Sequence, residues 1–143
     1  LYGDRLSLQK VGKIHITDKK ILPHSKYFDD LTNNKICLSL NGAGEICNRD
    51  IEILSAKSVL LRPKLNIKFH NDLIPYKHYI PFEVDKNPLK QSELIIEKYN
   101  EIKNNTKLLK TISENGYDWY RQNGTIDSNV EILKKIINLN KLK

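Results

Sequence analysis

Residue types that can bind a phosphate cluster in residues 41–52, which read NGAGEICNRDIE. Gly42 and Gly44 permit a tight loop whose backbone N–H groups can approach a ligand closely. Arg49 stays charged at neutral pH, and its planar guanidinium can bind two phosphate oxygens at once. A nucleotide diphosphate needs such donors, a helix N-terminus and a cation in one concave place. The stretch therefore predicts an anion site with a diphosphate as candidate ligand.

The segments around this stretch predict a strand, a loop, a helix and a second strand. Residues 36–40 are an apolar run rich in β-formers, and a second apolar run at 59–61 ends at Arg62-Pro63. Apolar residues at helical spacing lie between them, with acidic residues near the expected helix start. The crossover is long enough to place the two strands parallel. Parallel sheets bind ligands at the carboxyl ends of their strands, so the loop after the first strand is the expected site.

Further elements are expected on both sides of this unit. Short elements are predicted at 11–16 (a strand), 27–31 (a helix) and 78–82 (a strand, at a sheet edge because Pro81 cannot donate a ladder hydrogen bond). Helices are predicted to start at Ser92 and at Thr106, and a last helix is predicted with Asp127 or Ser128 as its cap. The pattern predicts an α/β fold in one domain over residues 1–143. We expect a Rossmann-like parallel sheet flanked by helices, with the helices concentrated in the C-terminal half.

The charge of the chain favours anionic partners without choosing among them. Lysine and arginine outnumber aspartate and glutamate by 24 to 17, which gives a formal charge of +7. The basic residues are spread along the chain, so a basic arm of the kind that binds nucleic acid is absent from the sequence. No run approaches the roughly 18 apolar residues of a membrane span, so none is expected.

Several residue types argue against other kinds of site. The two cysteines, Cys37 and Cys47, have neither a disulfide-framework nor a zinc-ligand spacing and are expected to be buried or incidental thiols. The four histidines show no ligand spacing, so neither a metal nor a cofactor is expected. The chain contains no methionine and opens on Leu1-Tyr2-Gly3. We therefore expect a piece of a longer protein.

Residues 36–63, the run HYIPFE and the aromatic cluster after Gly116 together resemble a known group of enzymes. They are similar to the C-terminal, nucleotide-sugar-binding half of GT-B glycosyltransferases. The protein O-glucosyl- and O-xylosyltransferase-like family, which includes capsule-associated and Rumi-like enzymes, looks closest. It also has a glycine pair followed by an arginine that opens a helix. Asn41 stands where that family usually has an aspartate.

The resemblance implies a function and a set of donor contacts. The donor would be a nucleotide-sugar, with UDP as the expected nucleotide, and a hexose or pentose would pass to a protein or glycan acceptor. Arg49 would meet the diphosphate, Glu52 the ribose or sugar hydroxyls, and the loop from Gly42 to Glu45 would admit the donor. The acceptor site and the catalytic base would lie in an N-terminal half. The implied donor-binding residues are Asn41, Gly42, Ala43, Gly44, Glu45, Arg49 and Glu52.

Simpler interpretations of the same residues stay open at this stage. The glycines can form a plain turn, Arg49 can pair with Asp50 or Glu45 on the surface, and Glu52 can be an exposed helix acid. Tyr117, Trp119 and Tyr120 have the spacing of core residues. Two other functions remain as alternatives: a basic α/β module that binds nucleic acid, and a non-catalytic interaction domain.

Overall fold

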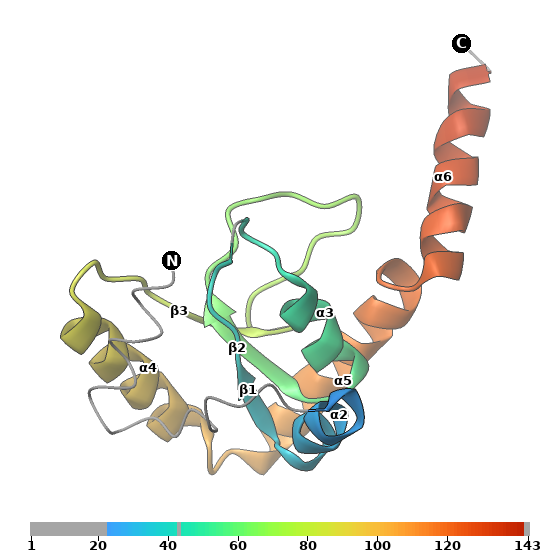
Figure 1. The fold of residues 1–143 in the computed structure, drawn as a ribbon. Helices are drawn as coiled ribbons and strands as arrows, with labels where there is room; N and C mark the ends of the chain where they lie inside the picture. Colours follow the sequence, from blue (N-terminus) through green and yellow to red (C-terminus); the bar gives the residue numbers. More distant parts are fainter. Residues whose placement is uncertain (1–22, 43, 142–143) are drawn as a thin grey trace.

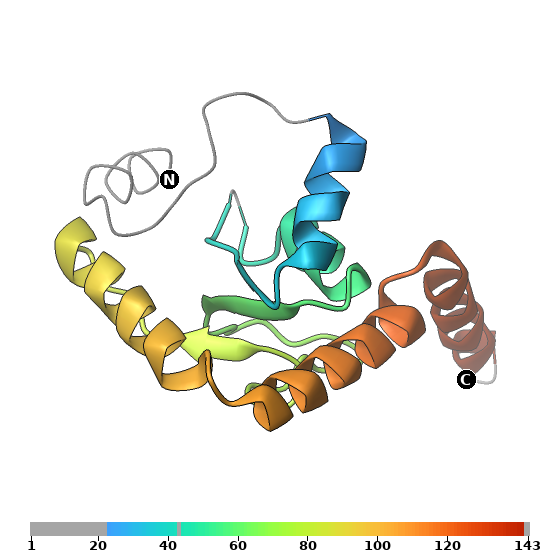
Figure 2. The same ribbon diagram turned by 90° about the horizontal axis from the view of Figure 1, so that it is seen from below.

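A computed structural model describes residues 23–42 and 44–141. These residues form three layers, with a small sheet between two layers of helices (Figure 1). Seen from below, α4 and α5 in yellow and orange run along one face of the sheet, and α2 and α3 in blue and teal lie on the other (Figure 2). The predicted α/β class with a parallel sheet flanked by helices is confirmed.

The sheet consists of three parallel strands in the order β1-β2-β3. They are β1 (Ile36–Leu38), β2 (Val59–Pro63) and β3 (Ile80–Phe82). Arg62 is in register with Pro81, so the edge strand β3 carries the proline, as expected. The expected strand at 11–16 lies outside the described residues.

Five helices accompany the sheet in the described part of the chain. They are α2 (His24–Asn33), α3 (Asn48–Ser55), α4 (Pro88–Ile102), α5 (Thr106–Asn123) and α6 (Ile126–Lys141). None of them is long and apolar enough to cross a membrane. Three follow β3, which confirms the predicted concentration of helices toward the C-terminus.

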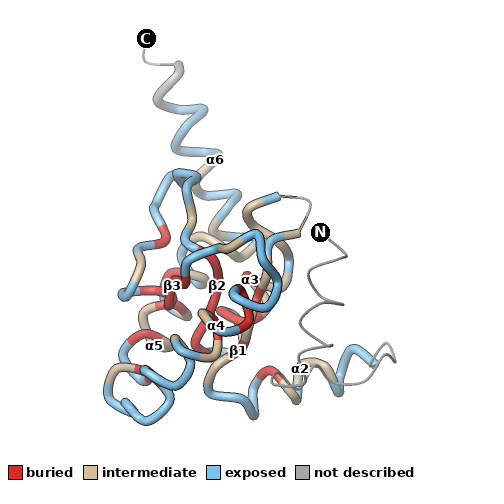
Figure 3. Tube along the Cα trace, turned by 90° about the vertical axis from the view of Figure 1, so that its left-hand side faces the viewer, coloured by how far each residue is buried: buried red, intermediate tan, exposed pale blue. Residues whose placement is uncertain are grey.

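Alternation along β2 divides the core between the two faces of the sheet. Val59 and Leu61 face α4 and α5 and pack in a cluster with Ile95 and Ile112. Leu60 faces the opposite side and packs with Ile53 and other residues of α2 and α3. All five residues of β2 are buried, including Arg62 (Figure 3). The middle strand is therefore covered on both faces, as is usual for a parallel sheet.

Two helix starts differ from the prediction because nearby polar side chains cap the helices earlier. The α4 helix starts at Pro88 and not at Ser92, since the Asn87 side chain accepts hydrogen bonds from the next backbone N–H groups and proline suits the first turn. The α6 helix starts at Ile126, so Asp127 and Ser128, the expected caps, already lie inside it. Thr125 and Ser128 exchange hydrogen bonds there.

Gly116 allows α5 to lie unusually close to the turn before β3. A Cβ atom at this position would lie 2.7 Å from the His78 carbonyl oxygen and 2.9 Å from Leu54 Cδ2. Both distances are shorter than van der Waals contact, and the nearer neighbour is backbone. The glycine therefore fixes how α5 packs against α3 and the turn, and it does not end the helix.

We expect Gly116→Ala to lower the free energy of unfolding by about 1–3 kcal/mol, because overpacking outweighs the better helix propensity of alanine. Urea denaturation measures the change. Thr111→Ala, at an exposed position of the same helix, is the control and should change stability little. A Gly116→Ala protein as stable as the wild type would contradict the close approach.

Candidate functional site

Arg62 lies at the carboxyl end of β2 and binds three neighbouring segments. Its side chain is 1 % exposed. Its Nη1 donates to Asp50 Oδ2 at 2.5 Å, and its Nη2 donates to Asn41 Oδ1 at 3.0 Å and to the Glu45 carbonyl oxygen. Its Nε donates to the Pro63 carbonyl oxygen at 3.0 Å. One guanidinium therefore joins β2, the loop after β1 and the N-terminus of α3.

Asp50 connects this arginine to the first turn of α3. Its Oδ2 also accepts a hydrogen bond from the Cys47 backbone N–H at 2.9 Å, and the Cys47 side chain in turn receives the Asp50 backbone N–H. This is a capping box with a cysteine at the N-cap. Asp50 Oδ1 is buried and accepts no hydrogen bond from the described residues. The carboxylate is therefore held through one oxygen, which Arg62 and Cys47 share.

Glu45 fastens the loop to the connection that follows β2. Its Oε2 accepts from the backbone N–H groups of Asn66 at 2.9 Å and Ile67 at 3.0 Å. These hydrogen bonds, the one from Asn66 foremost, lower the pKa of the Glu45 carboxyl. The ionised Glu45 side chain therefore links the loop after β1 to the connection that follows β2. This use differs from the donor contact that the resemblance implies.

Arg49 and Glu52 of α3 lie close to Tyr27 of α2. The Tyr27 hydroxyl donates to Glu52 Oε2 at 2.7 Å. Burial, and then the hydrogen bond and charge of Glu52, raise the pKa of Tyr27 to about 12, while Arg49 opposes the rise. Arg49 makes no ion pair with a carboxylate of the described residues. It is therefore a half-buried cation that forms no ion pair within the described part of the chain.

The two glycines are not required by the packing of the loop. A Cβ at Gly42 would lie 3.5 Å from Cys47 Cβ, and one at Gly44 would lie 3.7 Å from the Ile46 carbonyl oxygen, which are ordinary contacts. Neither residue has the positive φ that favours glycine. Alanine would therefore fit at either position without strain.

The structure thus separates the predicted residues into two groups. Asn41 and Glu45 accept hydrogen bonds from Arg62, Glu52 accepts one from Tyr27 with Arg49 close by, and Ala43 lies outside the described residues. The simpler interpretations of the charged residues are wrong: Arg49 pairs with neither Asp50 nor Glu45, and Glu52 is half-buried.

Sequence reasoning missed three residues of the site, namely Tyr27, Asp50 and Arg62. In the sequence Arg62 stands at the end of an apolar run, and a lone charge between buried neighbours needs a buried partner. Asp50, three residues after Cys47, carried the spacing of a capping box. No signal in the sequence links Tyr27 to Glu52, because that contact depends on how α2 packs.

The two thiols take structural roles here. Both cysteines are free; Cys37 is buried, which raises the pKa of its thiol, and Cys47 caps α3. No group of side chains in the described ranges could hold a metal ion.

A comparison with protein-family models finds no match to this chain, and a comparison with curated proteins finds none either.

Breaking the buried ion pair should be costly. We expect Arg62→Met to lower the free energy of unfolding by about 3–5 kcal/mol, because it leaves Asp50 charged, buried and without its partner. The double variant with Asp50→Leu should lose much less than the sum of the two single changes. Lys90→Met, which breaks an exposed pair with Asp85, is the control and should change little. Equal stabilities of Arg62→Met and Lys90→Met in urea denaturation would contradict the account.

Titration to alkaline pH should show that the environment of Tyr27 raises the pKa of its hydroxyl. A pKa raised from 10.0 to about 12 contributes stability that is complete below pH 10 and is lost as pH rises toward 12. The difference in phenolate absorbance between wild type and Tyr27→Phe measures this titration. Glu52→Gln should bring the midpoint part of the way back, since burial remains. A Tyr27 midpoint near 10 in the wild type would show that the hydroxyl is not held by Glu52.

Proposed function

We propose that this chain is the nucleotide-sugar-binding domain of a glycosyltransferase, with the β1–α3 loop as the place where the diphosphate binds. The observation that carries the proposal is the parallel β1–α3–β2 unit, whose glycine loop lies at the carboxyl end of β1 and leads into the first turn of α3, where Arg49 forms no ion pair with a carboxylate of the described residues. The resemblance to GT-B enzymes supplies the reaction class.

Arg49 suits a diphosphate that becomes a leaving group. Transfer breaks the bond between C1 of the sugar and a diphosphate oxygen, so negative charge grows on the diphosphate. The acceptor hydroxyl forms the new bond to C1, and its proton passes to a base in the other half of the enzyme. A cation that interacts more strongly with the diphosphate as this charge develops stabilises the transition state more than the bound substrate, and so lowers the activation barrier.

Glu52 suits a hydroxyl of the ribose or the sugar. Tyr27 binds one oxygen of its carboxylate and fixes the side chain, while Oε1 makes no hydrogen bond to any described residue. A carboxylate oxygen that is held in place accepts a ligand hydroxyl at little cost in side-chain entropy. Arg62 and its hydrogen-bond partners, which we call the Arg62 network, would then act indirectly, because they hold the loop and the start of α3 in position.

The second candidate function is a non-catalytic interaction domain, which α6 favours. This helix projects from the rest of the fold and is mostly exposed (Figures 1 and 3). Its large apolar side chains are at least 40 % exposed at Ile126, Val130, Leu133, Ile136 and Ile137. Exposed apolar side chains of this kind can form an interface with another protein. In the proposed glycosyltransferase, that partner would be the N-terminal half of the enzyme.

Thermal stability in the presence of ligands tests the proposal. A nucleotide diphosphate should raise the free energy of unfolding by about 2.7 kcal/mol at a hundredfold excess over its Kd. The probes are UDP, GDP, CMP, UDP-glucose, UDP-xylose and a short DNA duplex. Arg49→Ala should abolish the response, and Gly44→Ala should reduce it while leaving the free protein as stable as before. Arg121→Ala is the matched control and should respond as the wild type does.

The other outcomes separate the alternatives. Stabilisation by DNA alone, falling steeply with salt, would replace the proposal with a nucleic-acid-binding module. No response to any probe would also overturn it and leave the interaction domain as the better-supported function.

A further inference from the structure

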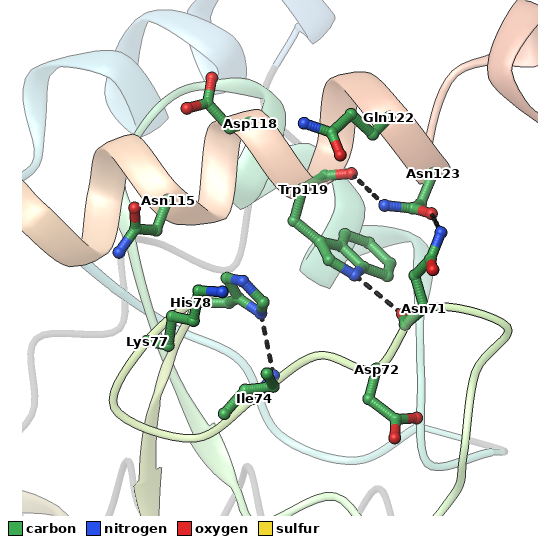
Figure 4. Close-up of a pocket in the computed structure, with 10 residues that line it drawn as sticks. All are labelled: Asn71, Asp72, Ile74, Lys77, His78, Asn115, Asp118, Trp119, Gln122 and Asn123. Atoms are coloured by element: carbon green, nitrogen blue, oxygen red, sulfur yellow. Dashed lines mark hydrogen bonds between the residues drawn. The ribbon is translucent and has the colours of Figure 1, made fainter.

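A hollow lies away from the glycine loop, between α5 and the connection from β2 to β3. Its volume is about 390 Å³, within the range of small-molecule sites. Figure 4 shows side chains of α5 on one wall and of residues 71–78 on the other. We call it the α5 hollow. Nothing in the proposed function uses it.

Uncharged hydrogen-bonding groups dominate the lining of the α5 hollow. Four carboxamides and two carboxylates line it, namely Asn71, Asn115, Gln122, Asn123, Asp72 and Asp118. Lys77 is the one lysine or arginine among the lining residues. An anion such as phosphate would meet more carboxylates than cations, so the lining disfavours it. Carboxamides offer donors and acceptors together, which suits a neutral ligand with many hydroxyl groups.

The wall formed by residues 71–78 is already ordered by hydrogen bonds. Asn71 Nδ2 donates to Asn123 Oδ1 at 2.6 Å, and the Trp119 indole N–H donates to the Asn71 carbonyl oxygen at 2.9 Å. The backbone N–H of Ile74 donates to His78 Nδ1 at 2.9 Å. A wall that does not need to be ordered on binding spares the entropy that ordering would cost.

His78 adds a donor of fixed identity. Because Nδ1 accepts from Ile74, the neutral ring must carry its proton on Nε2. Burial, and then the charge of Lys77, lower the pKa of His78, which favours the neutral ring. The Nε2–H group has no acceptor among the described residues and belongs to a side chain that lines the hollow.

The other wall presents free acceptors and donors at helical spacing. Asn115, Asp118 and Gln122 are three and four residues apart, so they share one face of α5. Their side chains make no hydrogen bonds to other described residues, and Figure 4 shows them along α5, with Asn115 to one side of His78, Gln122 above Trp119 and the Asp118 carboxylate directed away from His78. Ile74 and Trp119 supply apolar surface between the walls.

We propose that the α5 hollow binds an uncharged saccharide, with Asp118 and Gln122 accepting and donating to its hydroxyl groups and His78 Nε2–H donating from the opposite wall. A sugar ring places several hydroxyls close together, and each is both donor and acceptor. This matches a dense lining of carboxamides and carboxylates better than a peptide, which offers one donor and one acceptor per residue. The site is separate from the diphosphate site and does not depend on it.

Trp119 makes a direct test possible, because it is the one tryptophan of the chain and lines the hollow. Titration of the full chain with methyl glycosides of glucose, galactose, mannose, xylose and N-acetylglucosamine should give a saturable change in tryptophan emission with at least one of them. The same titration followed by NMR should shift the Trp119 indole N–H and the Gln122 carboxamide signals.

Variants on the α5 wall should weaken this binding without disturbing the fold. Asp118→Ala and Gln122→Ala each should raise the Kd about tenfold or more, because each removes a hydrogen-bonding group. Asp127→Asn, at an exposed position of α6, is the control and should leave the Kd unchanged. Arg49→Ala should also leave it unchanged, which separates this site from the diphosphate site.

Three results would overturn the proposal. One is the absence of both an emission change and the NMR shifts with every glycoside of the panel. Another is saccharide binding that persists unchanged in the Asp118→Ala, Gln122→Ala double variant. The third is a saturable response of Trp119 to inorganic phosphate with none to the glycosides, which would assign the hollow to an anion.

Discussion

The buried ion pair between Arg62 and Asp50 is the constraint on which the carboxyl edge of the sheet depends. Both side chains are 1 % exposed, so each charge relies on the other for compensation. The pair connects the end of β2 to the first turn of α3, and further hydrogen bonds of Arg62 reach the loop between β1 and α3. The position of the loop therefore follows from where a strand places one arginine.

The contacts of the charged side chains near this loop decide which of them are available to a ligand. Arg62 is enclosed, Asp50 is its partner, and Glu45 holds backbone N–H groups of the next connection. Arg49, one residue before Asp50, belongs to no ion pair of the described residues, so the network orders the helix start without using this cation. Structural and ligand-binding roles can thus lie side by side in one short segment.

Much of the fold was predictable from the sequence because apolar runs and glycine breaks are local signals. Hydrophobic periodicity and chain-breaking residues were sufficient to predict β1, β2 and the helix between them. They also predicted the edge position of β3 and the start of α5 at Thr106. The α4 start was misplaced because the Asn87 cap lies outside the apolar pattern. Local patterns do not reveal which distant residues meet, so the contacts of Arg62 with Asn41 and of Tyr27 with Glu52 were missed.

The central claim is that the β1–α3 loop and Arg49 form a diphosphate site that the Arg62 network holds in place. Chemical-shift mapping of the labelled full chain during titration with UDP tests it most directly, because it reports where the ligand binds. The account predicts saturable shifts concentrated on the backbone amides of residues 41–49 and on the Arg49 side chain. Shifts that are absent, or that concentrate on the α5 hollow, would contradict it.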